Sequence, residues 1–436
     1  MHRVKCILSS SPSQRCLDRF SILDPSDEDQ EGTVSTWALI RKLLHSPVTS
    51  SSALVDILES ISVTIRDSTG RAGDYGTLRK VVEASGRSAA FFSKTWPAIV
   101  AAALAMPRLF PGHDLLKLTP GEKLRLSRAQ CASLVAHQFL CTYDVPREDF
   151  FDFSVWYGSE QRHPAAVEMY LEALFTHFDT LDLPNENTYR HEDDNHVIEY
   201  SLYVLAPLDS YKLQDLSKTP LHAIHVVQVD KYSTQQQEYN HQYPDSAVVI
   251  SANKDIGFGQ SATQEELHMG NSPEACAAVL FTPRLAADQV LVIQGAAPML
   301  RIEGQRRDIV WRRLDPEERR GGRMLLMDAL EMDEASGADN DGGLPDLLDA
   351  NIERELLKAY TAFASWHSTA VVPTVWSGLW GCGAFNGEPA VKALILWIAA
   401  SLAGKELKLV LDSSEALFAA RLSRIAAMKF VGPRAK

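Results

Sequence analysis

The stretch that decides the fold joins an apolar run to a pair of glutamates through a loop that contains two glycines. It runs Ser251-Ala252-Asn253-Lys254-Asp255-Ile256-Gly257-Phe258-Gly259-Gln260-Ser261-Ala262-Thr263-Gln264-Glu265-Glu266-Leu267. The residues before it, Ala247–Ile250, predict a buried strand, and open α/β sheets bind ligands in loops at the carboxyl ends of such strands. Gly257 and Gly259 would let backbone amides approach an anion closely. Taken alone, the stretch also fits a surface turn with two solvated glutamates.

A second glycine-rich segment lies near the C-terminus. It runs Trp376-Ser377-Gly378-Leu379-Trp380-Gly381-Cys382-Gly383-Ala384-Phe385-Asn386-Gly387-Glu388-Pro389. It follows a predicted strand and precedes a predicted helix, which suits a loop that wraps phosphate groups. The segment lacks the Lys-Ser/Thr pair of a P-loop and the glycine spacing of a dinucleotide fingerprint. Nucleoside triphosphatases and hydride-transfer enzymes are therefore disfavoured.

Apolar patterns divide the chain into a mainly helical part and an α/β part. From Thr33 to about Thr180, apolar residues recur near the 3.6-residue period of a helix. Beyond it, short β-branched runs predict strands at His196–Ala206, His222–Val229, Ser246–Ala252, Val290–Gln294 and Val371–Trp376. Helices are predicted at Pro273–Leu280, Leu344–Trp366, Pro389–Leu402 and Glu415–Met428. Strands that alternate with helices predict an α/β fold with helices on the faces of a sheet.

Three segments follow from this pattern. Residues 1–31 are too polar to bury and are predicted to be disordered or frayed. Residues 32–195 would form a helical accessory domain, and residues 196–436 an α/β domain. The acidic stretch Glu331–Asp346 is predicted to be an exposed loop.

Composition bounds the class of protein. The chain has 436 residues, 45% of them hydrophobic and 23% charged, which is typical of a globular protein. The net charge of −13 argues against binding to nucleic acid through a broad basic surface. A polyanion gripped locally by backbone amides remains compatible with this charge.

Metal and membrane sites are not expected. The six cysteines show no zinc or redox spacing, and the run His191–His196 fits a solvated loop better than a metal site. The start of the chain shows no secretory pattern, and the longest apolar run is far shorter than a bilayer span of about 20 residues. No Gly-x-Ser-x-Gly elbow of a serine hydrolase is present. We expect a soluble intracellular protein without a metal or other cofactor.

Together these motifs resemble a known family. The segments are Leu126–Thr142, Ala252-Asn253-Lys254, Gln264-Glu265-Glu266, Trp380-Gly381-Cys382-Gly383-Ala384-Phe385 and Lys392-Ala393-Leu394. In this order they are similar to the poly(ADP-ribose) glycohydrolases, over about residues 120 to 415. The resemblance implies a macrodomain, a mixed sheet flanked by helices, preceded by a mainly helical accessory domain. It also implies hydrolysis of ribose–ribose bonds and a place in the DNA damage response.

The resemblance assigns roles to individual residues. Glu266 would be the catalytic acid/base, while Glu265 would hold ribose hydroxyls. Asn253 would help to fix the scissile ribose, and Gln264 would lie beside the nucleotide. The remaining positions would surround the diphosphate or line the same cleft: Gly257, Phe258, Gly259, Gly381, Cys382, Gly383, Ala384, Phe385 and Gln305.

The spacing of the two glutamates bears on the mechanism. Neighbours on a helical turn point in different directions, so Glu265 and Glu266 cannot flank one bond from opposite faces. The two-carboxylate arrangement of most glycosidases is therefore not expected. One carboxyl group can protonate the leaving oxygen and then deprotonate water, provided that its pKa is raised.

Two positions depart from the family pattern. Phe258 replaces the middle one of three consecutive glycines, and Gln305, after Gly304, takes the place of a tyrosine that closes over the ligand. The Phe258 ring either points away from the diphosphate or fills the space of that tyrosine. We predict the second arrangement, in which the ring stacks on the nucleotide.

Two further functions stay open at this point. The chain could be a macrodomain that binds ADP-ribose without turnover, or an unrelated α/β nucleotide-binding protein. Retention of both Glu265 and Glu266 favours the enzyme. The expected partners are poly(ADP-ribose) or ADP-ribosylated proteins, with no direct nucleic-acid binding and no membrane. A monomer in the nucleus or cytoplasm is expected.

Overall fold

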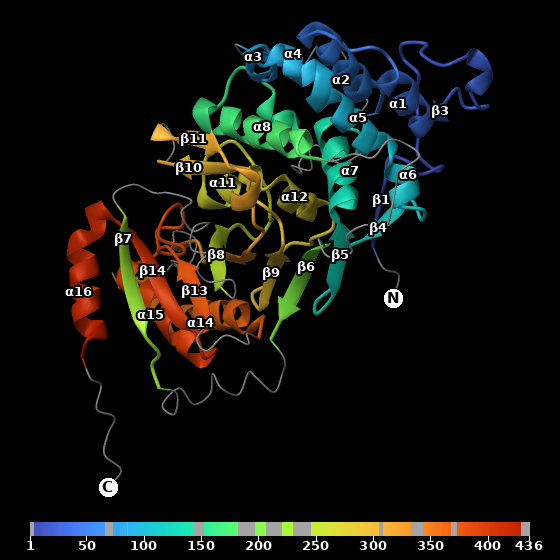
Figure 1. The fold of residues 1–436 in the computed structure, drawn as a ribbon. Helices are drawn as coiled ribbons and strands as arrows, with labels where there is room; N and C mark the ends of the chain where they lie inside the picture. Colours follow the sequence, from blue (N-terminus) through green and yellow to red (C-terminus); the bar gives the residue numbers. More distant parts are fainter. Residues whose placement is uncertain are drawn as a thin grey trace.

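An eight-stranded mixed sheet forms the centre of the computed structural model, which describes residues 4–65, 73–84, 86–143, 152–181, 197–205, 220–229, 246–304, 308–332, 343–367 and 373–428 (Figure 1). In spatial order the strands are β5 (Lys123–Ser127), β6 (Val197–Val204), β9 (Gln289–Gln294), β12 (Arg323–Asp328), β8 (Ser246–Ala252), β13 (Thr374–Ser377), β14 (Glu406–Asp412) and β7 (Ile224–Val229). The five strands from β12 to β7 are parallel, and β9 runs antiparallel to β12.

Strand β8 explains why the sheet is covered on both faces. Val248 and Ile250 belong to one apolar cluster, while Ala247 and Val249 belong to a second cluster on the opposite face. Successive side chains of a strand point to opposite faces, so an unbroken apolar run requires burial on both sides.

The helices form two groups around this sheet. The helical part contains α1 (Thr36–Leu44), α2 (Ser51–Ile65), α3 (Gly76–Glu83), α4 (Ser88–Ala90), α5 (Trp96–Leu104), α6 (Met106–Leu109), α7 (Arg128–Phe139), the 3-10 helix η3 (Phe153–Trp156) and α8 (Pro164–Asp179). The α/β part contains α11 (Gln264–Asn271), α12 (Pro273–Cys276), α14 (Asp349–Ala364), α15 (Pro389–Leu402) and α16 (Ala416–Ala426). Helices α14 and α15 pack together on one face of the sheet, and α11 lies between the other face and α8 (Figure 1).

Most predicted elements of the α/β part are confirmed. The five predicted strands correspond to β6, β7, β8, β9 and β13, and the helix predicted at Pro389–Leu402 is α15. The sequence analysis missed β12 and the hairpin of β10 (Leu300–Glu303) and β11 (Val310–Arg313). Both β12 and the hairpin lie in stretches rich in arginine, where charged residues interrupt the apolar pattern from which a short strand is predicted.

The N-terminal segment contradicts the expectation of disorder for residues 4–31. Strand β1 (Lys5–Ile7) pairs with β4 (Asp114–Leu116), and β2 (Arg15–Cys16) pairs with β3 (Val34–Ser35). Leu8 is fully buried in the core, and the Ser9 hydroxyl lies 2.9 Å from the Thr142 hydroxyl. Strand pairing and side-chain hydrogen bonds thus satisfy a segment that is too polar to fold by apolar burial alone.

The helical and α/β parts share one apolar core. The cluster on the α11 side of the sheet also contains residues of α1, α2, α5, α7 and α8. Strand β5, which precedes α7, extends the sheet by pairing with β6. The predicted boundary at residue 195 falls among residues outside the described ranges, so the segment limits stay a prediction.

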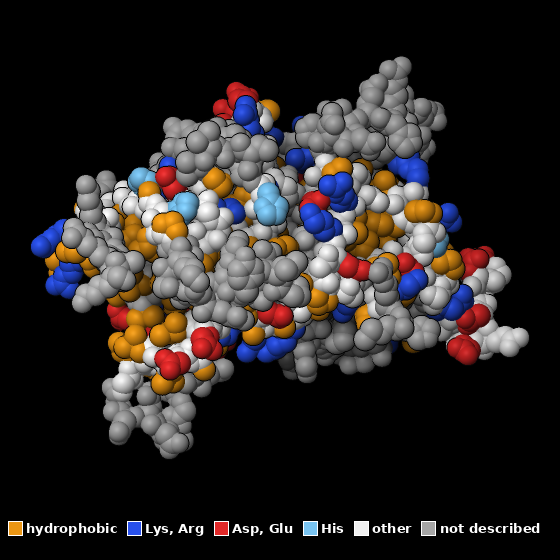
Figure 2. Space-filling model, turned by 90° about the horizontal axis from the view of Figure 1, so that it is seen from below, with side chains coloured by type: hydrophobic (Ala, Val, Ile, Leu, Met, Phe, Trp, Pro, Cys, Tyr) orange, Lys and Arg blue, Asp and Glu red, His pale blue; other side chains and the backbone are white. Residues whose placement is uncertain are grey.

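Surface charge is mixed on the face in Figure 2. Lys and Arg side chains are interspersed there with acidic and apolar side chains, and the described residues form no continuous basic area on this face. The expectation that nucleic acid is not bound stays a prediction. Among the described residues, no helix combines the length and apolarity needed to cross a membrane.

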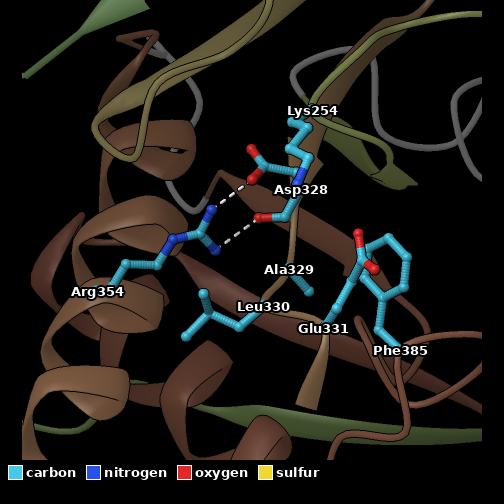
Figure 3. A pocket seen from close by; sticks show the side chains of 7 residues that line it. All are labelled: Lys254, Asp328, Ala329, Leu330, Glu331, Arg354 and Phe385. Atoms are coloured by element: carbon cyan, nitrogen blue, oxygen red, sulfur yellow. Dashed lines mark hydrogen bonds and ion pairs between the residues drawn. The ribbon is translucent and has the colours of Figure 1, made fainter. Parts of the chain in front are cut away.

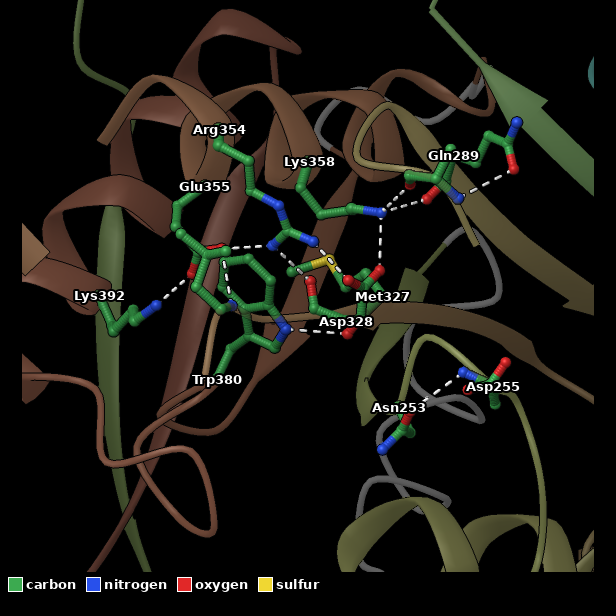
Figure 4. Close-up of polar contacts among 12 residues, drawn as sticks. Asn253, Asp255, Gln289, Met327, Asp328, Arg354, Glu355, Lys358, Trp380 and Lys392 are labelled. Carbon is green, nitrogen blue, oxygen red and sulfur yellow. Dashed lines mark hydrogen bonds and ion pairs between the residues drawn. The ribbon is translucent and has the colours of Figure 1, made fainter. Parts of the chain in front are cut away.

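A buried group of charges holds the end of β12 in place (Figure 4). The Lys358 ammonium donates to Asp328 Oδ1 at 2.7 Å and to the carbonyls of Ala286 and Gln289 at 2.7 and 2.6 Å. Arg354 forms an ion pair with the other Asp328 oxygen. Burial lowers the pKa of Lys358, and the Asp328 carboxylate opposes this shift. The point where β12 ends is therefore fixed by charge as well as by strand pairing.

We predict that Lys358→Met lowers the free energy of unfolding by about 3 kcal/mol, because it leaves Asp328 and two carbonyls short of a donor in a buried site. The matched control is Lys5→Met, which breaks an exposed pair with Asp114 and should cost less than about 1 kcal/mol. Urea denaturation followed by tryptophan fluorescence measures both changes. Equal effects of the two substitutions would contradict the importance of the buried group.

Candidate active site

The carboxyl ends of three parallel strands bring the two sequence motifs together. Ala252 at the end of β8 pairs with Asp328 at the end of β12, and β13 pairs with the other side of β8. The loops that follow β8 and β13 therefore leave the same edge of the sheet. A cavity of about 250 Å³ opens there, and Figure 3 shows its lining residues: Lys254, Asp328, Ala329, Leu330, Glu331, Arg354 and Phe385.

Glu265 lies in the first turn of α11 with its carboxylate turned into the protein. Its side chain is 6% exposed and accepts hydrogen bonds from the backbone amides of Asn253 at 2.8 Å and Gly257 at 3.0 Å. Burial raises the pKa of Glu265 to about 8, and the two amide donors partly oppose this shift. This carboxylate therefore ties the loop of residues 253–263 to the helix that follows it.

Glu266 occupies the third position of the same helix and is partly exposed. Its carboxylate accepts from the Thr263 amide at 3.1 Å, while the Thr263 hydroxyl accepts from the Glu266 amide, which makes a capping box. Burial raises the pKa of Glu266, and nearby backbone amides and Arg162 oppose the shift. A raised pKa is the direction that a general acid requires.

Gly259 makes room for the Glu266 carboxylate. A Cβ atom at this position would lie 2.4 Å from Glu266 Oε1, so a larger residue would displace the acid. The chain then enters α11 through Ala262, whose φ of 53° is in the left-handed region. Such positions are costly for residues with a side chain, and they cluster at functional sites.

Gln264 and Asn253 have structural contacts in addition to their expected roles. Gln264 accepts from the Ser251 amide at 3.0 Å and donates to the Val249 carbonyl at 3.2 Å, which fastens α11 to β8. Asn253 is exposed, and its side-chain oxygen accepts from the Asp255 amide at 3.0 Å. Asn253 is therefore accessible to a ligand, whereas Gln264 is held against the strand.

The stacking role predicted for Phe258 is wrong. The ring is 3% exposed and packs against Phe153 and Trp156 of η3, at centroid distances of 4.9 and 5.2 Å. An apolar ring is stabilised more by burial in an aromatic cluster than by exposure in a polar cleft. Phe258 thus points toward the helical part of the protein.

The glycine-rich loop after β13 rests on Lys392 and Trp380. Gly381 has a φ of 78°, and a Cβ atom there would lie 2.6 Å from Ala329 Cβ. The fully buried Lys392 ammonium lies 5.1 Å from the Trp380 ring centroid and forms an ion pair with Glu355. The buried ammonium of Lys392 therefore packs against the base of this loop and supports it.

The outer part of this loop faces away from the core. Gly383 and Ala384 are exposed, and apart from its chain neighbours no atom of the described residues lies within 4 Å of a Cβ atom placed on Gly383. Burial raises the pKa of the Cys382 thiol to about 12, which disfavours its nucleophilic thiolate form at neutral pH. Phe385 lines the cavity (Figure 3).

Comparison with known proteins agrees with this geometry. Residues 213–418 match the sequence model of the poly(ADP-ribose) glycohydrolase catalytic region with the macro domain fold, and residues 84–201 match that of its helical domain. Together the two matches span most of the chain. The chain belongs to the poly(ADP-ribose) glycohydrolase family.

Individual members of the family are distant relatives. Poly(ADP-ribose) glycohydrolases 1 and 2 of Caenorhabditis elegans are 26% and 28% identical, each over 66% of this chain. The chain covers 36% and 57% of the length of these two relatives. A solved poly(ADP-ribose) glycohydrolase of Deinococcus radiodurans in complex with ADP-ribose has a TM-score of 0.35 and 14% identity, covering 52% of this chain and 95% of the other.

The resemblance to the glycohydrolase family found from the sequence is thus confirmed, and so is the macrodomain with a helical domain before it. The structure places the loop of residues 253–263 and the loop of residues 378–387 after the neighbouring strands β8 and β13, and Lys254 and Phe385 line one cavity. Glu265 and Glu266 follow the first loop and are not among the residues that line this cavity. Gln305 lies outside the described residues. Within the described ranges, no group of three or more His, Cys, Asp or Glu side chains could hold a metal ion.

Two residues that line the cavity, Asp328 and Arg354, were not singled out from the sequence. Lys254, which also lines the cavity, and Lys392, which supports its glycine-rich loop, lay in the segments that resemble the family but had no predicted role. A usable signal was present, because Arg354 and Lys358 are one helical turn apart in α14 and therefore lie on the same face of the helix. Asp346, expected in an exposed loop, is 4% exposed and lies 3.8 Å from Lys392. The Lys392 ammonium thus allows the Asp346 carboxylate to be buried, although the stretch around it is polar.

We predict that Gly381→Ala lowers the free energy of unfolding by roughly 1–3 kcal/mol, because the left-handed backbone and the contact with Ala329 leave no room for a methyl group. Gly383→Ala is the matched control in the same loop. It should change the free energy of unfolding by less than about 0.5 kcal/mol, since a Cβ atom there meets open space. Thermal and urea denaturation measure both values, and equal losses would show that the loop is not fixed at Gly381.

Proposed function

We propose that this chain hydrolyses the ribose–ribose O-glycosidic bonds of poly(ADP-ribose) and releases ADP-ribose, with Glu266 as the acid/base. The observation that carries the proposal is the placement of Glu266. It is a partly buried carboxyl group with a raised pKa, at the sheet edge where the two family motifs meet. Membership of the glycohydrolase family supplies the substrate class.

The chemistry needs one carboxyl group in two protonation states. Protonated Glu266 donates its proton to the leaving ribose oxygen as the glycosidic bond breaks. The resulting carboxylate then takes a proton from the water that attacks the oxocarbenium-like centre. The substrate diphosphate lies close to this centre and stabilises its positive charge. Glu266 regains its proton in the second step and is ready for another cycle.

Glu265 has a different part in this scheme. Each of its two oxygens accepts one amide, from Asn253 and Gly257, which holds the carboxylate against the loop and leaves a second lone pair on each oxygen. It cannot act as a second catalytic carboxylate on the opposite side of the bond, which agrees with a single-acid mechanism. In the proposal Glu265 holds ribose hydroxyls from the edge of the site, and Asn253 fixes the scissile ribose. Gln264 lies beside the nucleotide.

The diphosphate is assigned to the two loops. The exposed backbone of Gly383 and Ala384, at the end of a loop supported by Lys392, offers amides without side-chain obstruction. Gly257 and Gly259 approach from the loop after β8. Cys382 and Phe385 line the same cleft, and Gln305 is proposed to lie beside the ligand.

A second candidate is an ADP-ribose-binding macrodomain without turnover. It is favoured by one observation, namely that Glu266 also caps α11 and so has a structural reason to be present. In both cases we propose poly(ADP-ribose) or ADP-ribosylated proteins as partners of a monomer in the nucleus or cytoplasm.

We predict that Glu266→Gln reduces hydrolysis of poly(ADP-ribose) by roughly 10² to 10⁴, because glutamine keeps the cap on α11 but has no proton acidic enough to transfer to the leaving oxygen. ADP-ribose binding should stay within about tenfold, since the shape of the site is preserved. Release of ADP-ribose from automodified polymer measures the hydrolysis rate, and titration calorimetry measures the affinity for ADP-ribose.

Glu318→Gln is the matched control for this experiment. Glu318 also closes a capping box, with Asp315, but it lies after β11 and away from the cavity. This variant should hydrolyse polymer at the wild-type rate. Hydrolysis of polymer by Glu266→Gln at the wild-type rate would contradict the proposed mechanism. A wild-type protein that binds ADP-ribose but does not hydrolyse polymer would establish the second candidate.

The fourth prediction concerns metal ions. The proposed acid/base step is carried out by a carboxyl group and water, so EDTA at a few times the total metal concentration should leave the hydrolysis rate unchanged. A loss of activity that a divalent ion restores would show that a metal takes part in the reaction. The rate is measured as free ADP-ribose before and after chelation, at one polymer concentration.

A further inference from the structure

We propose that Phe258 and Trp156 are positioning residues, through which the helical part of the protein fixes the loop that holds Glu266. This inference rests on the proposed function of Glu266. At position 258 this chain has phenylalanine in place of the middle one of the family's three consecutive glycines. A glycine there would have no side chain that the helical part could anchor.

The anchor is a cluster of aromatic rings. Phe153 and Trp156 stack in parallel, with centroids 4.5 Å apart and an angle of 7° between the rings. The Phe258 ring packs on both, and Trp156 also contacts Tyr170 of α8 at 5.2 Å. Phe153, Trp156 and Phe258 are each at most 3% exposed. The catalytic loop therefore inserts one ring into the core of the helical part.

A hydrogen bond fixes the next residue of the loop. The Trp156 indole nitrogen donates to the carbonyl oxygen of Gly259 at 2.8 Å, across 103 positions of sequence. One tryptophan thus holds the side chain of position 258 by packing and the backbone of position 259 by a directed bond. A third contact, from the Arg162 amide to the Gln260 side-chain oxygen, is longer at 3.4 Å.

Gly259 links these contacts to the carboxyl group of Glu266. The space that a side chain would occupy at this position is taken by Glu266 Oε1. The Gly259 backbone therefore forms one wall around the carboxyl group and keeps water from that side. If the loop moves outward, the carboxyl group gains water and also loses its fixed direction toward the scissile bond.

The charges that act on Glu266 come from two elements. Arg162 belongs to the segment between η3 and α8, and its positive charge lowers the pKa of Glu266. Glu265 is the neighbour on α11, and the charge of Glu266 raises the pKa of Glu265. Burial raises the pKa of Glu266 by more than Arg162 and the amides of the loop lower it, so a loosened loop should lower this pKa toward that of an ordinary glutamate.

The experiment compares three purified full-length variants with the wild type. Phe258→Leu weakens the ring anchor without opening a large cavity, and Trp156→Phe keeps a ring but removes the bond to Gly259. Phe91→Leu is the matched control, because Phe91 is also buried in an aromatic cluster of the helical part but contacts Phe92 and Phe175 instead of the loop. Each protein is first shown to be folded by circular dichroism.

Three readouts separate positioning from a structural role. Hydrogen exchange reports the protection of residues 257–263 and needs no activity. Steady-state hydrolysis of poly(ADP-ribose) gives kcat, and calorimetry gives the Kd for ADP-ribose. The pH profile of kcat/KM reports the acid, whose loss of a proton at alkaline pH stops the reaction. A lower pKa of Glu266 moves this alkaline limb to lower pH.

For both loop variants we expect faster exchange in residues 257–263 and a kcat lower by about threefold to tenfold, with the Kd changed by less than about twofold. The alkaline limb should move down by about half a pH unit or more. Phe91→Leu should show none of these changes. If Phe258→Leu and Trp156→Phe match the control in exchange, kcat and pH profile, the inference is overturned while the proposed function stands. A wild type without hydrolysis overturns both.

Discussion

The burial of one carboxylate shapes the loop on which this site depends. Glu265 is turned inward at the start of α11, where its oxygens accept the amides of Asn253 and Gly257. Those two amides lie at the beginning and the middle of the loop, so the chain must fold back over the first turn of the helix. The positive end of the helix dipole also favours acidic side chains there. Glu266 then points to the other side of the turn, toward Gly259 and the open edge of the sheet.

The surrounding structure holds this loop from three directions. Strand β8, which is buried on both faces of the sheet, lies at the start of the loop, and Gln264 fastens α11 to this strand. The helical part contributes aromatic rings that anchor Phe258. On the far side, the ion pairs of Lys358 and Lys392 fix the end of β12 and the glycine-rich loop. The candidate site is thus held by packing and buried charge, so in the proposed function a ligand meets a surface that is already formed.

Much of this arrangement was predictable from the sequence. The apolar run at Ala247–Ile250 identified the central strand. Each glycine motif was predicted to follow a strand, and the family resemblance implied that both surround the diphosphate. The prediction failed where side chains of distant segments decide the outcome. Phe258 looked exposed because its neighbours are glycines, but its partners lie about 100 positions earlier in the chain. Asp346 looked solvated in an acidic stretch, and its cation is on another helix. The N-terminal strands were hidden because their pairing partners are remote and their sequence is polar.

A crystal structure of Glu266→Gln bound to a short poly(ADP-ribose) oligomer tests the central claim most directly, since the variant keeps the shape of the site and cannot turn the ligand over. The account predicts that the side-chain amide of residue 266 lies within hydrogen-bond distance of the bridging glycosidic oxygen. It also predicts that the diphosphate lies against the backbone of Gly383 and Ala384. A ligand whose glycosidic oxygen lies far from residue 266, or whose diphosphate binds away from both glycine loops, would contradict it.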